Sequence, residues 1–198
     1  PYARLLLDTQ AIGHRDTVPA RRGRPASSAG FEWAVRMAAS VAAHLADRGY
    51  TVDLVTPTPR TVDAPIADGP VGPVLGELAV IELAERVGEL DGRPASGAPP
   101  VVAIAAAPDD ATLRWMLAQR SSRAPAVALL VGPPAPVPPT SLDPDPDPDP
   151  ALRAFAAAGW RVARVSASTP HDVAWLALLG DPSAVRRDPA SAMRVPHG

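Results

Sequence analysis

The chain has 198 residues with a formal net charge of −2, and its isoelectric point is near 6.1. That length suits one well-buried domain, because domains commonly run to roughly 100–200 residues. The slightly acidic balance argues against a nucleic-acid-binding domain, which is expected to have a basic face. The absence of Cys excludes disulfides, thiolate nucleophiles and Cys-based zinc sites, and no apolar stretch approaches the ~20 residues of a membrane span.

The first expected element is a buried strand that ends in a carboxylate. Residues 2–10 read Tyr-Ala-Arg-Leu-Leu-Leu-Asp-Thr-Gln, and a continuous apolar run of this kind is typical of a parallel strand covered on both faces. Asp8 then lies at the carboxyl end of the strand, where open α/β sheets bind their ligands. Residues 11–28 are rich in Arg, Gly and Pro and predict a long surface loop.

That loop and the end of the strand supply candidates for contacts with a partner. The candidates are Thr9, Gln10, His14, Arg21, Arg22 and Arg24. The three arginines form a basic cluster, which is either simply solvated or contacts an anion or a partner. The sequence leaves both interpretations open.

A βαβ unit is expected next. Ser28 to Arg48 repeats apolar residues at helical spacing until Gly49 stops the helix, and Tyr50 to Thr56 predicts the second strand. Two strands joined by such a helix are parallel, so the sheet is expected to be parallel from its first step. Pro57 to Pro73 contains five prolines and predicts a loop, and Val74 to Leu90 predicts a second helix.

The rest of the chain continues to alternate strands and helices. The expected elements are a strand over 101–107, a helix over 111–119 with Asp109 as its N-cap, a strand over 126–131, a helix over 151–158, a strand over 160–165 and a helix over 170–179. Residues 133–150 end in Asp-Pro repeats and predict an extended, solvated tether, and residues 181–198 predict a C-terminal tail. The fold class is therefore a three-layer, Rossmann-like α/β domain over residues 1–180, with a mainly parallel sheet of about five strands flanked by helices.

The usual nucleotide and hydrolase motifs are missing. The first turn reads Asp-Thr-Gln-Ala-Ile-Gly, which is neither a P-loop nor a dinucleotide fingerprint, and no Gly-x-Ser-x-Gly elbow occurs. The run from Thr169 to Asp172 looks catalytic, but a helix start explains it, with Thr169 as cap and Pro170 in the first turn. These observations argue against nucleotide binding.

One constellation of carboxylates remains. If the third strand lies beside the first, on the side opposite the second, then Asp8, Thr9 and Asp109 or Asp110 converge in the crevice where the strand order reverses. Hard oxygen ligands of this kind suit Mg²⁺. The alternative is structural: Asp8 accepts hydrogen bonds from backbone amides of the following loop, and Asp109 caps its helix.

Several segments resemble the C-terminal, von Willebrand factor A-like region of bacterial domain-of-unknown-function family fifty-eight. They are Arg-Leu-Leu-Leu-Asp-Thr at 4–9, Phe-Glu-Trp-Ala-Val-Arg-Met-Ala-Ala-Ser-Val-Ala-Ala-His-Leu at 31–45, Gly-Tyr-Thr-Val-Asp-Leu-Val-Thr at 49–56 and Ala-Gly-Trp-Arg-Val-Ala at 158–163. The resemblance covers residues 2 to about 179. Members of the family that this chain resembles carry an N-terminal membrane hairpin upstream of this region. Together with a start at Pro1, this leads us to expect that the chain is a fragment.

The resemblance implies a non-enzymatic protein–protein interaction domain, cytoplasmic and belonging to an inner-membrane-anchored bacterial protein. It also implies a MoxR-type AAA+ ATPase as the partner, whereas the expectation of no nucleic-acid partner comes from the charge balance. Von Willebrand A-like domains often bind a divalent ion through Asp-x-Ser-x-Ser, but here Gln10 and Ile12 replace both hydroxyl residues after Asp8. Thr56 and Asp109 match the distant ligands only loosely, so we expect a degenerate metal site and no cofactor. The alternative function is a Mg²⁺-dependent hydrolase or phosphatase that uses Asp8 and Asp109.

Overall fold

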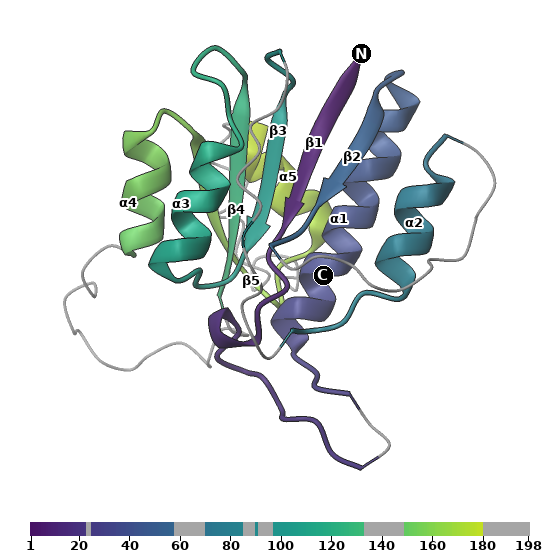
Figure 1. The fold of residues 1–198 in the computed structure, drawn as a ribbon, viewed down its shortest axis with the longest axis vertical. Helices are drawn as coiled ribbons and strands as arrows, with labels where there is room; N and C mark the ends of the chain where they lie inside the picture. Colours follow the sequence, from purple (N-terminus) through teal and green to yellow (C-terminus); the bar gives the residue numbers. More distant parts are fainter. Residues whose placement is uncertain (23–24, 58–69, 85–89, 91–96, 133–148, 180–198) are drawn as a thin grey trace, which may run out of the picture.

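A parallel sheet of five strands forms the centre of the protein in the computed structural model, which describes residues 1–22, 25–57, 70–84, 90, 97–132 and 149–179 (Figure 1). The strand order is β2-β1-β3-β4-β5, and every neighbouring pair is parallel. The strands are β1 (Tyr2–Leu7), β2 (Thr51–Val55), β3 (Val101–Ala105), β4 (Ala126–Gly132) and β5 (Arg161–Ser166). The predicted α/β class and the parallel sheet are confirmed.

The first strand lies in the interior of the sheet, between β2 and β3. Leu5 is paired with Leu54 of β2 on one side and with Val102 of β3 on the other. The strand order therefore reverses between β1 and β3, which meets the condition under which the sequence predicts that Asp8 and Asp109 converge. In open α/β sheets this reversal opens a crevice beyond the carboxyl ends of the strands.

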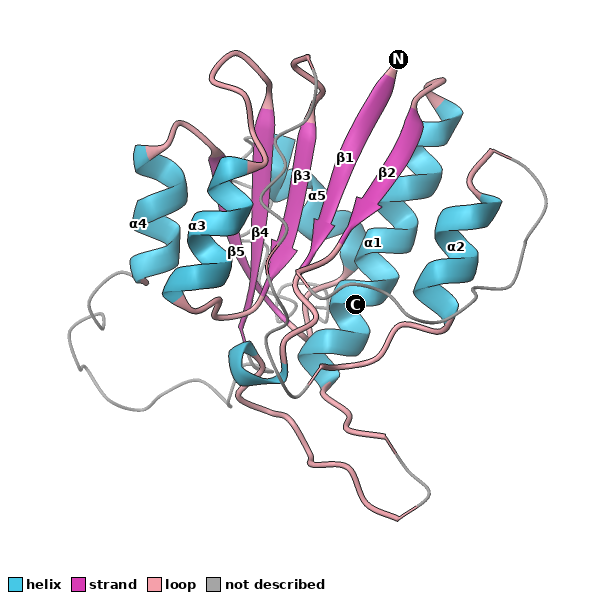
Figure 2. Cartoon of the chain, in the orientation of Figure 1, coloured by secondary structure: helices cyan, strands magenta, loops and turns pink. Residues whose placement is uncertain are grey.

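Helices cover both faces of the sheet, which makes the fold three-layered (Figure 2). The helices are α1 (Ala29–Asp47), α2 (Gly72–Ala79), α3 (Asp110–Ala118), α4 (Pro150–Ala157) and α5 (His171–Leu179). Leu5 and Leu7 belong to a core shared with α1, α2 and α5, whereas Leu6 belongs to the core shared with α3 and α4. Because successive side chains of a strand point to opposite faces, burial on both faces explains the continuous apolar run of β1.

The predicted helix over 74–90 is wrong for residues 80–84, which the structure shows outside any helix, and residues 85–89 of it lie outside the described residues. The helix α2 ends at Ala79, and Ala84 runs alongside the chain that follows β1. The Ala84 N–H donates to the carbonyl of Thr9 at 2.7 Å, and the Ala11 N–H donates to the carbonyl of Ala84 at 3.0 Å. The backbone beyond β1 needs partners for its polar groups, and this long-range pairing overrides local helical spacing.

The predicted ends of two other helices are confirmed. Gly49 follows α1 with φ 81°, and Gly159 follows α4 with φ 76°. Both values lie in the left-handed region that glycine adopts without a steric cost, so each glycine ends its helix. Of the predicted tether over 133–150, residues 133–148 lie outside the described residues, whereas Asp149 and Pro150 do not belong to a tether but begin α4, as its N-cap and first residue. The tail over 181–198 and most of the proline-rich loop over 57–73 also lie outside the described residues.

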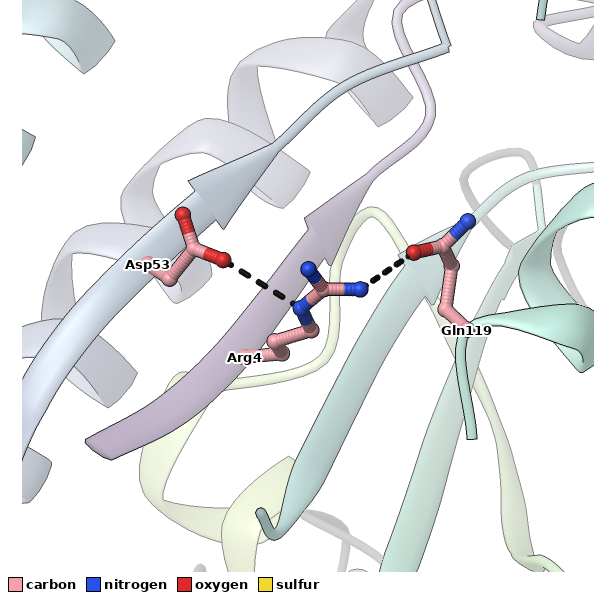
Figure 3. A network of polar contacts seen from close by, with 3 residues as sticks. All are labelled: Arg4, Asp53 and Gln119. Atoms are coloured by element: carbon pink, nitrogen blue, oxygen red, sulfur yellow. Dashed lines mark hydrogen bonds and ion pairs between the residues drawn. The ribbon is translucent and has the colours of Figure 1, made fainter. Parts of the chain in front are cut away.

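The helix α2 packs on the same face of the sheet as α1, opposite the face on which Arg4 and Leu6 of β1 lie. A polar network lies there (Figure 3). The Arg4 guanidinium donates to Asp53 Oδ2 at 3.2 Å and to Gln119 Oε1 at 2.5 Å. This network explains why a charged residue interrupts the apolar run of β1, since Arg4 joins β1 to β2 and to the end of α3.

No helix in the described part of the chain combines the length and the hydrophobicity that crossing a membrane requires.

Candidate functional site at the carboxyl edge of the sheet

The carboxyl group of Asp8 is sealed beneath the turn that follows it. Asp8 is 1% exposed, and its Oδ1 accepts a hydrogen bond from the Gln10 N–H at 3.0 Å. A short 3₁₀ turn, η1 (Ala11–Gly13), closes over the other oxygen: a Cβ added to Gly13 would lie 3.2 Å from Asp8 Oδ2 and 3.1 Å from the Ala107 carbonyl oxygen. Asp8 thus takes the structural role that the sequence had left as an alternative.

Burial raises the pKa of Asp8 to about 7, because desolvation disfavours the charged carboxylate. The hydrogen bond from Gln10 opposes this effect, and the negative charge of Asp109 adds to it. Among the described groups, Asp8 Oδ2 has no hydrogen-bond partner. A carboxyl that keeps its proton near neutral pH is a poor ligand for Mg²⁺, which binds the ionised form.

Asp109 lies close enough to act on Asp8, as the reversal of strand order predicts. It is engaged at the start of α3, where its Oδ1 accepts a hydrogen bond from the Thr112 N–H at 2.8 Å. Asp109 is therefore the N-cap that the sequence indicates. Thr56, the third weak candidate for a metal ligand, is half-buried after β2. Within the described residues, no three His, Asp or Glu side chains are grouped so that they could hold a metal ion.

Residues 14–22 and 25–28 belong to an arm that projects from this edge of the sheet (Figure 1). The two sides of the arm are joined at Val18 and Ser27, whose backbone groups exchange hydrogen bonds of 2.7 and 3.1 Å. Arg21 and Arg22 are exposed on the arm, and Arg24 lies outside the described residues. Two apolar side chains are exposed in the same region, Val18 at 54% and Ile12 of η1 at 72%.

The root of the arm is fixed to the start of α1. Asp16 Oδ1 accepts a hydrogen bond from the Ser28 hydroxyl at 2.6 Å, and its Oδ2 accepts one from the Gly30 N–H at 2.9 Å. The Ser28 oxygen in turn accepts from the Phe31 N–H at 3.0 Å. Burial favours a higher pKa for Asp16, but the hydrogen bonds from Ser28 and Gly30 and the nearby His14 outweigh it and lower the pKa.

The other predicted contact residues are not on the surface of the loop. Thr9 and Gln10 are buried, because the chain beyond β1 is enclosed between Ala84 and β3. His14 is 3% exposed and packs edge-on against Phe31, with ring centroids 5.5 Å apart. Desolvation lowers the pKa of His14, although the Asp8 backbone and the Asp16 carboxylate oppose the shift. Of these candidates, Arg21 and Arg22 remain available to a partner.

A pocket of about 590 Å³ opens beside His14, at the carboxyl ends of β3 and β4. Its volume lies in the range of ordinary ligand sites, roughly 300–1,000 Å³. Its lining combines His14, Arg15, Asp16, Asp110, Asp149 and Arg164 with Leu113, Leu130, Val131 and several small residues. Asp16, Asp149 and Arg164 were not singled out from the sequence, because nothing in the local pattern places them around one pocket.

Three helices begin at this pocket, namely α1, α3 and α4. In other α/β proteins such N-termini bind phosphate through free N–H groups and the helix dipole. Here each N-terminus already holds a carboxylate of the chain itself, from Asp16, Asp109 and Asp149 respectively. Asp149 also lies 3.5 Å from Arg164, which partly neutralises that cation. The pocket is therefore not arranged as a phosphate cradle.

The chain matches no protein-family model, no curated protein and no solved structure.

Asp8 and Asp109, the two carboxylates that a metal site or a hydrolase would use, hold the backbone in place. The exposed groups are the arm, η1 and the rim of the pocket. The arm is fixed to the start of α1 through Asp16. The role of this residue depends on a contact with Ser28, twelve positions further along the chain.

Proposed function

We propose that this chain is a non-enzymatic protein–protein interaction domain that binds its partner through the arm and the adjoining turn η1. The observation that carries the proposal is the exposure of Ile12 and Val18 close to Arg21 and Arg22 on a segment anchored to the body of the domain. Protein interfaces typically combine apolar side chains with Arg. The two arginines favour a partner surface that is apolar with an acidic rim.

The geometry at Asp8 supports this function over the alternative of a Mg²⁺-dependent hydrolase. That chemistry needs an accessible, ionised carboxylate to hold a metal ion. Burial and the closure of η1 over Asp8 work against both requirements. The hydrolase would be favoured instead if Mg²⁺ or Mn²⁺ raised the melting temperature of the wild-type protein and did not raise that of Asp8→Ala.

The resemblance to domain-of-unknown-function family fifty-eight extends the proposal. On that resemblance, we propose that this domain belongs to the cytoplasmic part of an inner-membrane-anchored bacterial protein and that a MoxR-type AAA+ ATPase is the first partner to test. This part of the proposal rests on the sequence segments quoted above, such as Arg-Leu-Leu-Leu-Asp-Thr at 4–9.

The test is a binding measurement between this chain and a purified MoxR-type AAA+ ATPase, with ATP and without. We expect the double variant Arg21→Glu, Arg22→Glu, and separately Val18→Asp, to weaken binding at least tenfold. The matched control is Arg36→Glu, Arg48→Glu, which makes the same change of charge at exposed positions of α1 and just beyond it. Equal loss in the control, or full binding by both arm variants, would refute the role of the arm. Failure to bind under every nucleotide condition would refute the choice of partner.

A further inference from the structure

The carboxyl group of Asp8 and the turn η1 are packed so closely that the state of one depends on the other. Asp8 is 1% exposed, and its Oδ2 has no hydrogen-bond partner among the described groups. Gly13 of η1 lies so near this oxygen that an added Cβ would be 3.2 Å from it. A negative charge on Oδ2 would therefore have neither water nor a hydrogen-bond donor to stabilise it. With η1 closed, the geometry favours the neutral, protonated carboxyl.

The turn η1 is held over Asp8 by backbone hydrogen bonds, with little apolar burial of its own. Gly13 donates its N–H to the Gln10 carbonyl at 3.2 Å, and its carbonyl accepts from the Ala107 N–H at 3.1 Å. Of the three residues of η1, only Gly13 is buried, and Ile12 is 72% exposed. Segments with few buried apolar contacts open at a lower free energy than the whole fold. The turn can therefore open while the sheet stays intact.

The charges around Asp8 do not stabilise its ionised form. Burial, and after it the negative charge of Asp109 at the start of α3, raise the pKa of Asp8 to about 7, although the hydrogen bond from Gln10 opposes them. His14, which follows η1, acts on the Asp8 backbone and is neutral at pH 7, because burial lowers its pKa. Glu82, on the segment that runs alongside the chain beyond β1, is exposed to water. None of these three side chains supplies a positive charge.

We propose that Asp8 is a proton-operated latch for η1: the turn closes over the protonated carboxyl and is released when the carboxyl gives its proton to water. Opening lets water solvate the carboxylate, so the open state favours the ionised form. The consequence for binding rests on the proposed function, because Ile12 belongs both to η1 and to the proposed contact surface. A rise in pH that opens η1 should then weaken binding of the partner.

The experiment is amide hydrogen exchange, followed by NMR on the full 198-residue chain at several pH values between 5 and 8.5, with no partner present. The reporters are the N–H groups of Gly13, His14 and Ala107, which are bonded within η1 or to it. Each exchange rate is converted to a protection factor, which removes the intrinsic effect of pH on exchange. The wild type is compared with Asp8→Asn, whose uncharged amide still has an oxygen to accept from the Gln10 N–H.

We expect the ratio of the protection factors, Asp8→Asn over wild type, to rise about tenfold per pH unit between pH 5 and 7 and then to level off. The reason is that the carboxyl has its ordinary pKa of 3.8 when η1 is open and a pKa of about 7 when it is closed. Ionisation of His14 affects both proteins and cancels in the ratio. Asp47→Asn, which removes an exposed carboxylate at the end of α1, is the matched control and should behave like the wild type.

A second measurement needs no variant. The carboxyl ¹³C signal of Asp8 in the wild type should titrate with a midpoint near pH 7, and the amide signal of Gly13 should shift with the same midpoint. An Asp8 carboxyl that titrates near 3.8 would overturn the inference whether or not Asp8→Asn folds.

The exchange data can also overturn it in three ways: a ratio that does not change with pH, the same rise in Asp47→Asn, or η1 amides protected as strongly as those of β1 and β3. The last result would mean that η1 opens only when the whole domain unfolds. Since no partner takes part, the outcome is separable from that of the proposed function. Loss of partner binding in the arm variants, together with a flat ratio, would eliminate the latch and leave the arm standing. A rising ratio with fully active arm variants would do the reverse.

Discussion

The raised pKa of Asp8 leads to a quantitative prediction about how the free energy of unfolding depends on pH. The folded state holds its proton up to about pH 7, whereas the unfolded chain releases it near the ordinary value of 3.8. Between these values the folded state binds more protons than the unfolded state, so the free energy of unfolding falls as the pH rises. Each pH unit removes about 1.4 kcal/mol, which gives an upper limit of about 4 kcal/mol lost by pH 7.

The perturbation that tests this is Asp8→Asn. The amide keeps an oxygen that accepts the hydrogen bond from the Gln10 N–H, and it has no charge to desolvate. We expect Asp8→Asn to unfold like the wild type near pH 4 and to exceed it increasingly up to pH 7, by as much as about 4 kcal/mol. For a chain of this size, 1 kcal/mol corresponds to roughly 2–4 °C in melting temperature.

The assay is urea unfolding followed by circular dichroism at several pH values between 4 and 8.5. Only the difference in the free energy of unfolding between the wild type and Asp8→Asn is used, because the ionisation of His14 contributes a pH dependence of opposite sign to both proteins. The lowered pKa of His14 makes the folded state lose stability as the pH falls below 6.5. A difference between wild type and Asp8→Asn that stays constant from pH 4 to 8 would refute the assignment of the raised pKa to Asp8.

Two further substitutions test the closure of η1 and the root of the arm. Gly13→Ala places a Cβ 3.1 Å from the Ala107 carbonyl oxygen and should lower the free energy of unfolding by about 1–3 kcal/mol. Gly132→Ala is its control, since the nearest atom lies 3.5 Å away, and equal losses would contradict the tight contact. Asp16→Ala removes an acceptor at the start of α1 and should cost about 1–2 kcal/mol in thermal unfolding. The same change at Asp47, the last residue of α1, should cost nothing, and a comparable loss there would rule out the capping role.

The elements of the fold were predictable because their signals are local. The apolar run of β1, the glycines after α1 and α4 and the cap at Asp109 each depend on residues within one element. The C-terminal limit of α2 was not predictable from local signals, because Ala84 pairs with backbone groups more than seventy residues earlier in the chain. The helical spacing of apolar residues from 80 to 90 contains no information about that competing long-range interaction.

The candidate site was predictable in position and not in chemistry. The place of Asp8 at the carboxyl end of a central strand followed from hydrophobicity and strand order. Its protonation depends on enclosure by η1 and on the charge of Asp109, about a hundred residues away. Likewise, Thr9 and Gln10 have the polarity of surface residues, and only the pairing of their backbone with Ala84 and β3 buries them.

The sequence by itself determined the alternation of strands and helices and the carboxylate at the end of β1, because periodicity and capping act over a few residues. Tertiary structure alone decided which charges are hydrated, paired or sealed. Arg4 reaches Asp53 and Gln119, Asp16 reaches the start of α1, and Asp8 loses contact with water. Solvation and Coulomb energies depend on distances in space, which local sequence does not specify.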